Sequence, residues 1–458
     1  MSLIQDARRA ARRTPPQRNR HVDLLRAFAI GVVVFGHWMA IVVWTGDELD
    51  ADSALEYLTW GHPLTWILQV MPLFFLVGGY ANAASIDSHH RRGGDTFGWL
   101  LNRGARLLRP TTVFLVALAA AGATARLLGA DASTVALGVW GASIPLWFLV
   151  AYISLVFLAP LAHAAHARYG MAFPVVAGVL VLLVDTVRIH GDAPIAGNAN
   201  YLLVWLIFHQ LGVAWHEGGI SATVRAGVPL CGAGLVTLVA LTTVGPYPVS
   251  MVSVPGAELQ NATPPTFALL VLGLTQCAAA MALSGPVNRA LRGARAWTGV
   301  VAVNTVVLTL FLWHMAAAVL VSAVLVGTGI MPQPDVDSAA WLLLRLPWLA
   351  ACAVVLAGLV ALFARIELRT AGLPRIHTVD DAALTGRLVL RRGAWRVMVI
   401  AAIVSAVGGL LIVAAAGSDY VSATGVPPAA LGCYLVGVSL LRFARARHSR
   451  ADAEPRQG

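Results

Sequence analysis

Long apolar segments dominate this sequence and leave it few folds to adopt. Twelve stretches approach or exceed the about 20 residues that a helix needs to cross a bilayer. They lie at approximately 24–44, 64–84, 111–129, 145–165, 172–189, 201–216, 226–245, 266–284, 301–326, 341–364, 395–416 and 426–443. Only 12% of the residues are charged, whereas a soluble domain carries about 25%. The sequence therefore predicts an all-α, polytopic membrane bundle and excludes an ordinary soluble enzyme.

Arginine placement predicts the orientation of this bundle. The chain has 32 basic residues, all of them arginine, and the loops of membrane proteins that stay in the cytoplasm retain positive charge. With the N-terminus inside, 28 arginines fall on the inner side and only Arg126, Arg188 and Arg345 on the outer side. We therefore expect both termini to face the cytoplasm. Because the positive charge is dispersed among loops, we predict no nucleic-acid partner; it suits membrane lipid headgroups instead.

A polar stretch late in the chain predicts that the chain is divided into a membrane core and a C-terminal membrane extension. Residues 367–394 form a cytoplasmic linker in this interpretation, between a ten-helix core at 21–366 and a two-helix membrane extension at 395–443. The tails at 1–20 and 444–458 are charged and contain proline, so we expect cytoplasmic basic tails without fixed structure. No repeat relates the two halves.

The missing lysines also exclude Schiff-base chemistry.

The first helix carries two ionisable residues on one face. Asp23 and Arg26 lie at its cytoplasmic mouth, and His37 follows Arg26 by eleven residues. Eleven steps of about 100° return to within about 20° of the starting direction, with a rise of about 16 Å. One wall of a cavity would thus display both Arg26 and His37.

Each of these residues has two open interpretations. Arg26 can clamp a phosphate, or it can reach the interface and pair with Asp23 at i, i+3. His37 can act as a general base or transient acyl carrier, or it can only bond a neighbouring helix.

Other polar groups at membrane depth lie in later spans. His209 and His314 fall near the middle of theirs. No carboxylate stands beside these histidines at ligand spacing, so we predict no metal. His209 faces an acceptor cavity or forms an interhelical hydrogen bond. Asp185 and Arg188 are three residues apart on one predicted helix. We expect them either to bind an acceptor or to form a salt bridge.

Five motifs follow one another in the order of a known family. The run from Asp23 through Arg26 to His37, with ten residues between arginine and histidine, resembles the first helix of the membrane-bound acyltransferase-3 family. The other four resembling elements are MPLFFLVGGYANAAS (71–85), RGARLLRP (103–110), PLWFLVAY (145–152) and LTLFLWHM (308–315). Together they cover residues 21 to about 366.

The resemblance implies roles for particular residues. His37 would be the catalytic histidine and Arg26 its partner, with Asp23 and His314 in support. The inner-loop arginines would bind the donor, and they are Arg103, Arg106 and Arg109. Trp147 matches the aromatic element and, with His209 and Asp185, is a candidate for an acceptor cavity. Tyr152 stands where many members have glutamate, so no acid is assigned there.

The resemblance also implies an activity. It predicts an O-acyltransferase, transferring groups other than aminoacyl groups, in the plasma membrane. The donor would be cytoplasmic acyl-CoA, with acetyl-CoA expected, and no cofactor would be bound. The acceptor would be a hydroxyl of an envelope carbohydrate, a glycolipid or a secreted small molecule. The alternative is a twelve-helix secondary transporter or exporter of an envelope precursor. The acceptor, the acyl chain length, the side of acceptor modification and the function of the extension stay open.

Overall fold

The computed structural model describes residues 3–45, 49–191, 193–371, 376 and 389–451. Its α-helices are α1 Leu3–Arg12, α2 Arg20–Ala40, α3 Thr65–Leu68, α4 Met71–His90, α5 Thr96–Leu127, α6 Ala132–Ser143, α7 Leu146–Tyr169, α8 Ala172–His190, α9 Asn200–His216, α10 Val224–Thr243, α11 Phe267–Ala282, α12 Ser284–Ala290, α13 Ala294–Thr305, α14 Val307–Leu325, α15 Ala339–Ala371, α16 Val389–Ala415 and α17 Pro428–Ala451. The shorter elements are strands β1 Ile41–Thr45 and β2 Leu49–Ser53 and the 3-10 helices η1 Ala54–Glu56, η2 Thr59–Leu64 and η3 Pro194–Ala199.

The predicted all-α membrane bundle is confirmed. Every predicted apolar segment contains a helix, and ten helices among the described residues are long and apolar enough to cross a membrane. The pair α11 and α12, bent by 50°, raises this number to 11 if it is one span. The remaining predicted segment is α9, which has 17 residues.

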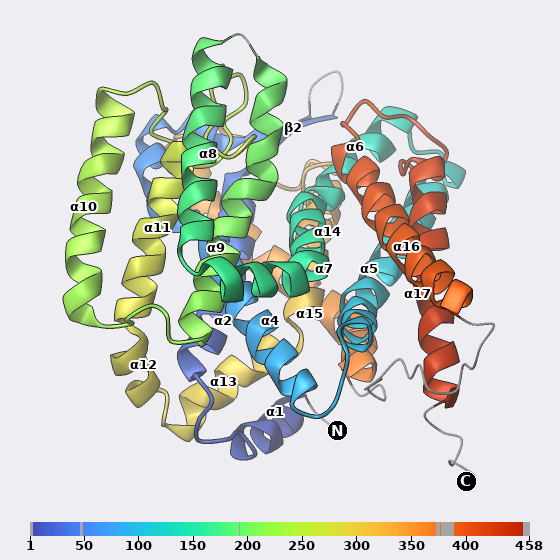
Figure 1. Cartoon of the computed structure of the whole chain (residues 1–458). Coiled ribbons are helices and arrows are strands. Elements are labelled where there is room, and N and C mark those ends of the chain that lie inside the picture. The colour runs from blue at the N-terminus through green and yellow to red at the C-terminus, as the bar shows by residue number, and fades with distance from the viewer. Residues whose placement is uncertain (1–2, 46–48, 192, 372–375, 377–388, 452–458) are drawn as a thin grey trace.

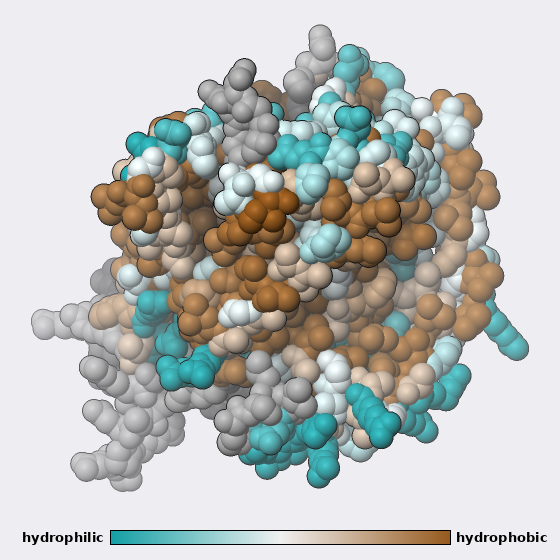
Figure 2. Space-filling model, turned by 180° about the vertical axis from the view of Figure 1, so that it is seen from behind, coloured by the Kyte–Doolittle hydropathy of each residue, from teal (hydrophilic) through white to brown (hydrophobic). Residues whose placement is uncertain are grey.

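The surface of the bundle has the polarity that a bilayer requires. Seen from behind, brown apolar side chains form a broad belt, and hydrophilic residues gather above and below it (Figure 2). Helices α1, α12 and α13 lie at one end of the bundle, and β2 and α6 lie at the other (Figure 1). Helix α17 ends near the α1 end, so the first and last helices meet the same polar rim (Figure 1).

The first span is shorter than predicted. Helix α2 stops at Ala40, and Ile41–Thr45 pairs antiparallel with Leu49–Ser53. The run Ile41-Val42-Val43-Trp44-Thr45 is β-branched and aromatic, which favours a strand over a helix. His37 therefore lies in the last turn of α2 and not near the middle of a span.

Helices α4 and α9 pack closely at the centre of the bundle. A Cβ on Gly79 would lie 1.9 Å from the His209 carbonyl oxygen, and one on Gly212 would lie 2.0 Å from that of Leu76. Only glycine permits this approach, because any side chain would meet the opposite backbone. The close packing brings Asn82 of α4 within reach of His209 of α9.

The two C-terminal helices form a tight pair that docks on the core. Gly409 of α16 and Gly437 of α17 each face the other helix's backbone at distances that exclude a Cβ. The Tyr434 hydroxyl donates to the Leu108 carbonyl at 3.1 Å and lies 3.1 Å from the Thr112 hydroxyl. Helix α17 of the extension therefore packs against α5 through the buried side chain of Tyr434.

Helices extend into three segments that the sequence assigned to tails or to the linker. The N-terminal tail contains helix α1, which packs on α13 with Ala7 buried, since its small apolar residues fit that surface. Helix α15 continues to Ala371, into the predicted linker, and α16 begins at Val389. Helix α17 continues to Ala451, into the predicted tail. The rest of the linker, apart from residue 376, and residues 452–458 lie outside the described part of the chain.

Candidate active site

Two histidines from distant parts of the sequence form a hydrogen-bonded pair. Nδ1 of His37 on α2 lies 2.8 Å from Nε2 of His314 on α14. The ring planes differ by 4° and their centroids are 5.1 Å apart, the geometry of two imidazoles bonded edge to edge in one plane. His314 is fully buried, and His37 is partly exposed. The Trp38 indole also donates to the His314 carbonyl at 2.9 Å, which fixes α2 against α14.

The hydrogen bonds around His314 determine which nitrogens carry protons. Nδ1 of His314 lies 2.7 Å from the Phe311 carbonyl oxygen, which can only accept, so this nitrogen donates. In a neutral ring, Nε2 of His314 must then accept, and Nδ1 of His37 donates to it. Nε2 of His37 makes no hydrogen bond to any described residue. This nitrogen therefore keeps its lone pair and can take a proton from a hydroxyl.

Arg26 lies below the histidine pair on the same helix. Its Nη1 lies 3.5 Å from Asp23 Oδ1 and donates to Asn304 Oδ1 at 3.4 Å. Asn304 on α13 in turn donates to the Asp23 backbone carbonyl at 2.8 Å. Asp23 itself accepts two hydrogen bonds from Arg18, at 2.6 and 2.8 Å, and raises the pKa of that guanidinium. Two arginines thus share one carboxylate, which leaves net positive charge at this end of α2.

Arg103 extends this positive region from α5. Its Nη2 donates to Asn82 Oδ1 at 3.0 Å, and the Asn82 amide lies 3.2 Å from His209 Nε2. The charge of Arg103 and the Tyr152 phenol act on Arg26 through space. Arg26 and Arg103 therefore lie close enough to interact electrostatically. His209 is buried and forms the interhelical bond that was one of its two predicted functions.

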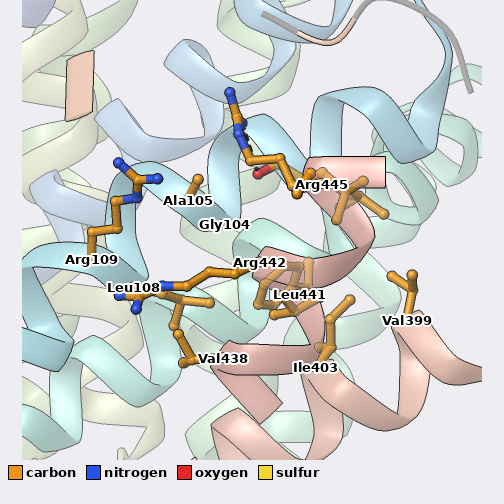
Figure 3. Close-up of a pocket in the computed structure, with 14 residues that line it drawn as sticks. Gly104, Ala105, Leu108, Arg109, Val399, Ile403, Val438, Leu441, Arg442 and Arg445 are labelled. Atoms are coloured by element: carbon orange, nitrogen blue, oxygen red, sulfur yellow. Dashed lines mark hydrogen bonds between the residues drawn. The ribbon is translucent and has the colours of Figure 1, made fainter. Parts of the chain in front are cut away.

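The other two predicted donor-binding arginines do not join Arg103. Arg106 is exposed, and Arg109 lines a separate cavity between α5 and the extension (Figure 3). Because six residues on a helix advance about 240° beyond a full turn, Arg109 points about 120° away from Arg103. The structure therefore does not bring the three arginines together at one point, since α5 continues as a helix through what looked like a loop.

Aromatic rings connect the level of Arg26 with the histidine pair. Tyr152 stacks on Phe148 at 5.7 Å, Phe148 meets Phe311 edge-on at 5.1 Å, and Phe311 lies 6.0 Å from His314. Trp147 adjoins Phe148 at 6.1 Å and is partly exposed. This apolar wall limits the water between the two polar levels.

Asp185 lies in a separate, closed network. Its carboxylate accepts from Asn200 at 3.1 Å, from Tyr247 at 3.1 Å and from the Phe267 backbone at 2.6 Å. Arg188 is farther away, at 3.9 Å. Burial and the neighbouring Asp185 raise the pKa of Tyr247, so its hydroxyl stays protonated and donates. With no exposed surface, Asp185 ties helices together and offers no atom to an acceptor.

The sequence did not reveal a carboxylate that supports the histidine pair. Glu367 near the end of α15 accepts from the Thr309 hydroxyl at 2.6 Å, from the Thr309 backbone at 2.9 Å and from the Leu308 backbone at 3.2 Å. These groups form the first turn of α14, whose own preceding residue, Val306, provides no cap. A carboxylate is favourable at a helix N-terminus. Glu367 is 58 residues from Thr309, so no local spacing could signal this contact.

Metal chemistry has no evident ligand set here. Within the part of the chain that the structure describes, no group of three or more His, Cys, Asp and Glu side chains could hold a metal ion. The paired histidines have each other and a backbone carbonyl as partners.

Fold and site together define a class of protein: a helical membrane protein with a hydrogen-bonded histidine pair between two helices and a positive region at one end. The acyltransferase-3 family model, described as an acyltransferase domain, matches residues 19–364. The chain belongs to this family and is a membrane acyltransferase. No curated protein and no solved structure matches the chain. Helices α16 and α17 lie beyond the matched residues.

Proposed function

We propose that this protein is an O-acyltransferase of the plasma membrane. It takes a short acyl group from cytoplasmic acyl-CoA, with acetyl-CoA the expected donor. It transfers this group to a hydroxyl of an envelope carbohydrate, a glycolipid or a secreted small molecule. The observation that carries the proposal is the His37–His314 hydrogen bond, which leaves Nε2 of His37 free on the helix that also presents Arg26.

The donor binds at the Arg26 end of α2 in this proposal. Arg26 and Arg103 approach from two helices, and Asp23 neutralises only part of the charge of Arg18 and Arg26. Guanidinium groups suit the phosphates of coenzyme A. The donor's thioester would then lie about 16 Å deeper, at the level of His37. An extended pantetheine arm along the aromatic wall would connect the two levels.

His37 acts as the general base on the acceptor. Its Nε2 removes the hydroxyl proton while the hydroxyl oxygen attacks the thioester carbonyl. The carbon–sulfur bond then breaks, and the imidazolium returns its proton to the departing thiolate of coenzyme A. His314 accepts the Nδ1 proton of His37 in a hydrogen bond throughout, which orients the base and stabilises its charged form. The bond to His314 fixes the tautomer with a free Nε2 lone pair, which a general base and an acyl-carrying nucleophile both need.

Fewer residues remain candidates for the acceptor site than the sequence suggested. Asp185 is saturated by protein groups, and His209 holds Asn82, which positions Arg103. Trp147 remains the candidate for contact with the acceptor, because it is partly exposed beside the aromatic wall. A flat ring of this kind suits the apolar face of a sugar.

Labelled acetyl-CoA tests the proposed function. Membranes carrying the wild type, His37→Ala, Arg26→Ala or the control His190→Ala are incubated with it; His190 is exposed on α8. We expect thioester consumption and acyl transfer in the wild type and control, and loss of both in the other two. Equal rates in all four would refute the enzyme and favour a transporter.

Mass spectrometry then identifies the acceptor. Envelope polysaccharides, glycolipids and secreted small molecules are compared between cells with and without the gene. We expect an added acyl mass on one fraction that depends on His37. An unchanged profile in every fraction would contradict all three acceptor classes.

A further inference from the structure

The chain between α1 and α2 is anchored on both sides of Arg18. Before Arg18, the Thr14 hydroxyl accepts a hydrogen bond from the Trp297 indole of α13 at 2.9 Å. After it, the side-chain oxygen of Asn19 accepts from the Asn288 amide of α12 at 2.8 Å. The match to the acyltransferase family begins at residue 19. Helix α1 and Arg18 therefore lie outside the matched residues, although their position on the bundle is well defined.

Arg18 is the closest cation to the Asp23 carboxylate. Its Nε lies 2.6 Å from Oδ2 and its Nη2 lies 2.8 Å from Oδ1, which are the two parallel hydrogen bonds that an arginine fork forms with a carboxylate. Arg26 is farther away, with Nη1 3.5 Å from Oδ1. The side chain of Asp23 is only 8% exposed, so water cannot replace its partners. Arg18 thus provides most of the hydrogen bonding that this carboxylate needs.

Arg26 is the second cation within reach of this carboxylate. Asp23 and Arg26 are three residues apart on α2, a spacing at which opposite charges on a helix pair. An unpaired charge in such a buried position is costly. Without Arg18, Asp23 would therefore take Arg26 as its partner. In the structure, by contrast, Arg26 makes only long contacts, at 3.5 Å to Asp23 and at 3.4 Å to Asn304.

We propose that Arg18 is a positioning residue for Arg26. It holds the Asp23 carboxylate, so that Arg26 keeps its charge and its N–H donors for the phosphates of the acyl donor. Arg18 acts through Asp23 and does not touch the donor. This inference rests on the proposed function. It also gives the N-terminal segment a function, because the packing of this segment on α12 and α13 brings Arg18 to Asp23.

Donor affinity of the full-length protein tests the function of Arg18. In Arg18→Gln, Asp23 is free to pair with Arg26, and an ion pair of this strength lowers the availability of Arg26 about fivefold. The Kd for coenzyme A and the KM for acetyl-CoA should therefore both rise about fivefold, with kcat unchanged. Isothermal titration calorimetry measures the Kd, and steady-state kinetics measure the KM. The matched control is Arg13→Gln, an exposed arginine of the same segment, which should leave both values unchanged.

A second substitution separates this positioning function from a structural one. Asp23→Asn removes the charge that competes for Arg26. The double variant of Arg18→Gln with Asp23→Asn should therefore lower the Kd and the KM again, to within about twofold of the wild type. If Arg18 bound the donor directly or only stabilised the fold, the second substitution would not restore donor affinity. Unchanged values in Arg18→Gln, or a double variant that binds coenzyme A as weakly as Arg18→Gln, would overturn the proposal.

Arg26→Gln distinguishes a failure of this proposal from a failure of the proposed function. Weaker binding of coenzyme A in Arg26→Gln, together with wild-type binding in Arg18→Gln, would overturn only the function of Arg18. A wild type that neither binds coenzyme A nor consumes acetyl-CoA would overturn the donor site as well. We expect both substitutions to weaken binding, with the larger effect in Arg26→Gln.

Discussion

His37 and His314 differ in what surrounds their ring nitrogens. Both nitrogens of His314 have partners, whereas Nε2 of His37 has none among the described residues. A hydrogen-bonded ring with one free nitrogen is an oriented base, and the second ring is its positioning residue. Because only His37 has a free ring nitrogen, His37 is the candidate base and His314 is the residue that positions it.

Arg26→Gln should weaken donor binding more than it slows chemistry. The substitution removes the positive charge but keeps a side chain that can bond Asn304. A hydrogen bond to a charged group contributes about 1.5–3 kcal/mol, so the KM for acetyl-CoA should rise roughly 10- to 100-fold. Steady-state kinetics at several donor concentrations measure this, with Arg168→Gln as the matched control. A fall in kcat at unchanged KM would place Arg26 at the reacting atoms instead.

At the residue scale, sequence reasoning worked where helical geometry alone decides a position. Arg26 and His37 both lie on α2, as the sequence predicted, and His314 was among the three histidines that it placed near the middle of a span. It could not show that His314 bonds His37, because 277 residues separate them. The family resemblance grouped Arg103 with Arg109, but α5 turns them to different sides.

Helix α14 depends on α15 for its first turn. Glu367 provides three hydrogen bonds to Leu308 and Thr309, less than two turns before His314 in the same helix. Any displacement of this turn would move the His314 ring, and a misplacement of about 1 Å can lower a rate by about 100-fold.

Glu367→Gln should therefore lower both stability and kcat. The amide nitrogen would face backbone N–H donors, so the free energy of unfolding should fall by about 1–2 kcal/mol. The KM for acetyl-CoA should stay constant, since Arg26 and Arg103 are untouched. Chemical unfolding in detergent and steady-state kinetics measure these effects. The control is Glu258→Gln, at an exposed loop position; a similar loss in this control would disprove the capping function.

Element boundaries were the weakest part of the sequence prediction, for a physical reason. Hydropathy locates apolar runs but does not distinguish a helix from a strand at their ends. The run from Ile41 to Thr45 is as apolar as the helix before it, yet it forms β1. Helix α1 was missed because arginines dominate its composition, while Ala7 on its other side is buried.

The whole bundle has one end rich in arginine. Helix α1 and the end of α17 lie toward the same end of the bundle (Figure 1). The extension contributes to this end through Arg442 and Arg445. The charge asymmetry that sequence counting detected is thus a property of the folded molecule, and the orientation inferred from it stays a prediction.

Cysteine labelling in intact cells tests that orientation. Arg8→Cys and Glu258→Cys introduce thiols at exposed positions in α1 and in the loop after α10. With the termini in the cytoplasm, a membrane-impermeant maleimide should label Glu258→Cys in intact cells and Arg8→Cys only after lysis. The wild type, which has four cysteines, provides the background. The reverse labelling pattern would invert the bundle and move donor binding to the outer side.

A double-mutant cycle on the histidine pair tests the central claim most directly. Acyl transfer is measured at saturating acetyl-CoA for the wild type, His37→Ala, His314→Ala and the double variant. A general base contributes about 10²- to 10⁴-fold to the rate, so His37→Ala should lose about that factor and His314→Ala less. Because His314 acts only through His37, the double variant should be no slower than His37→Ala alone. A double variant whose loss equals the product of the two single losses would contradict the claim, since it would mean that the two histidines act independently.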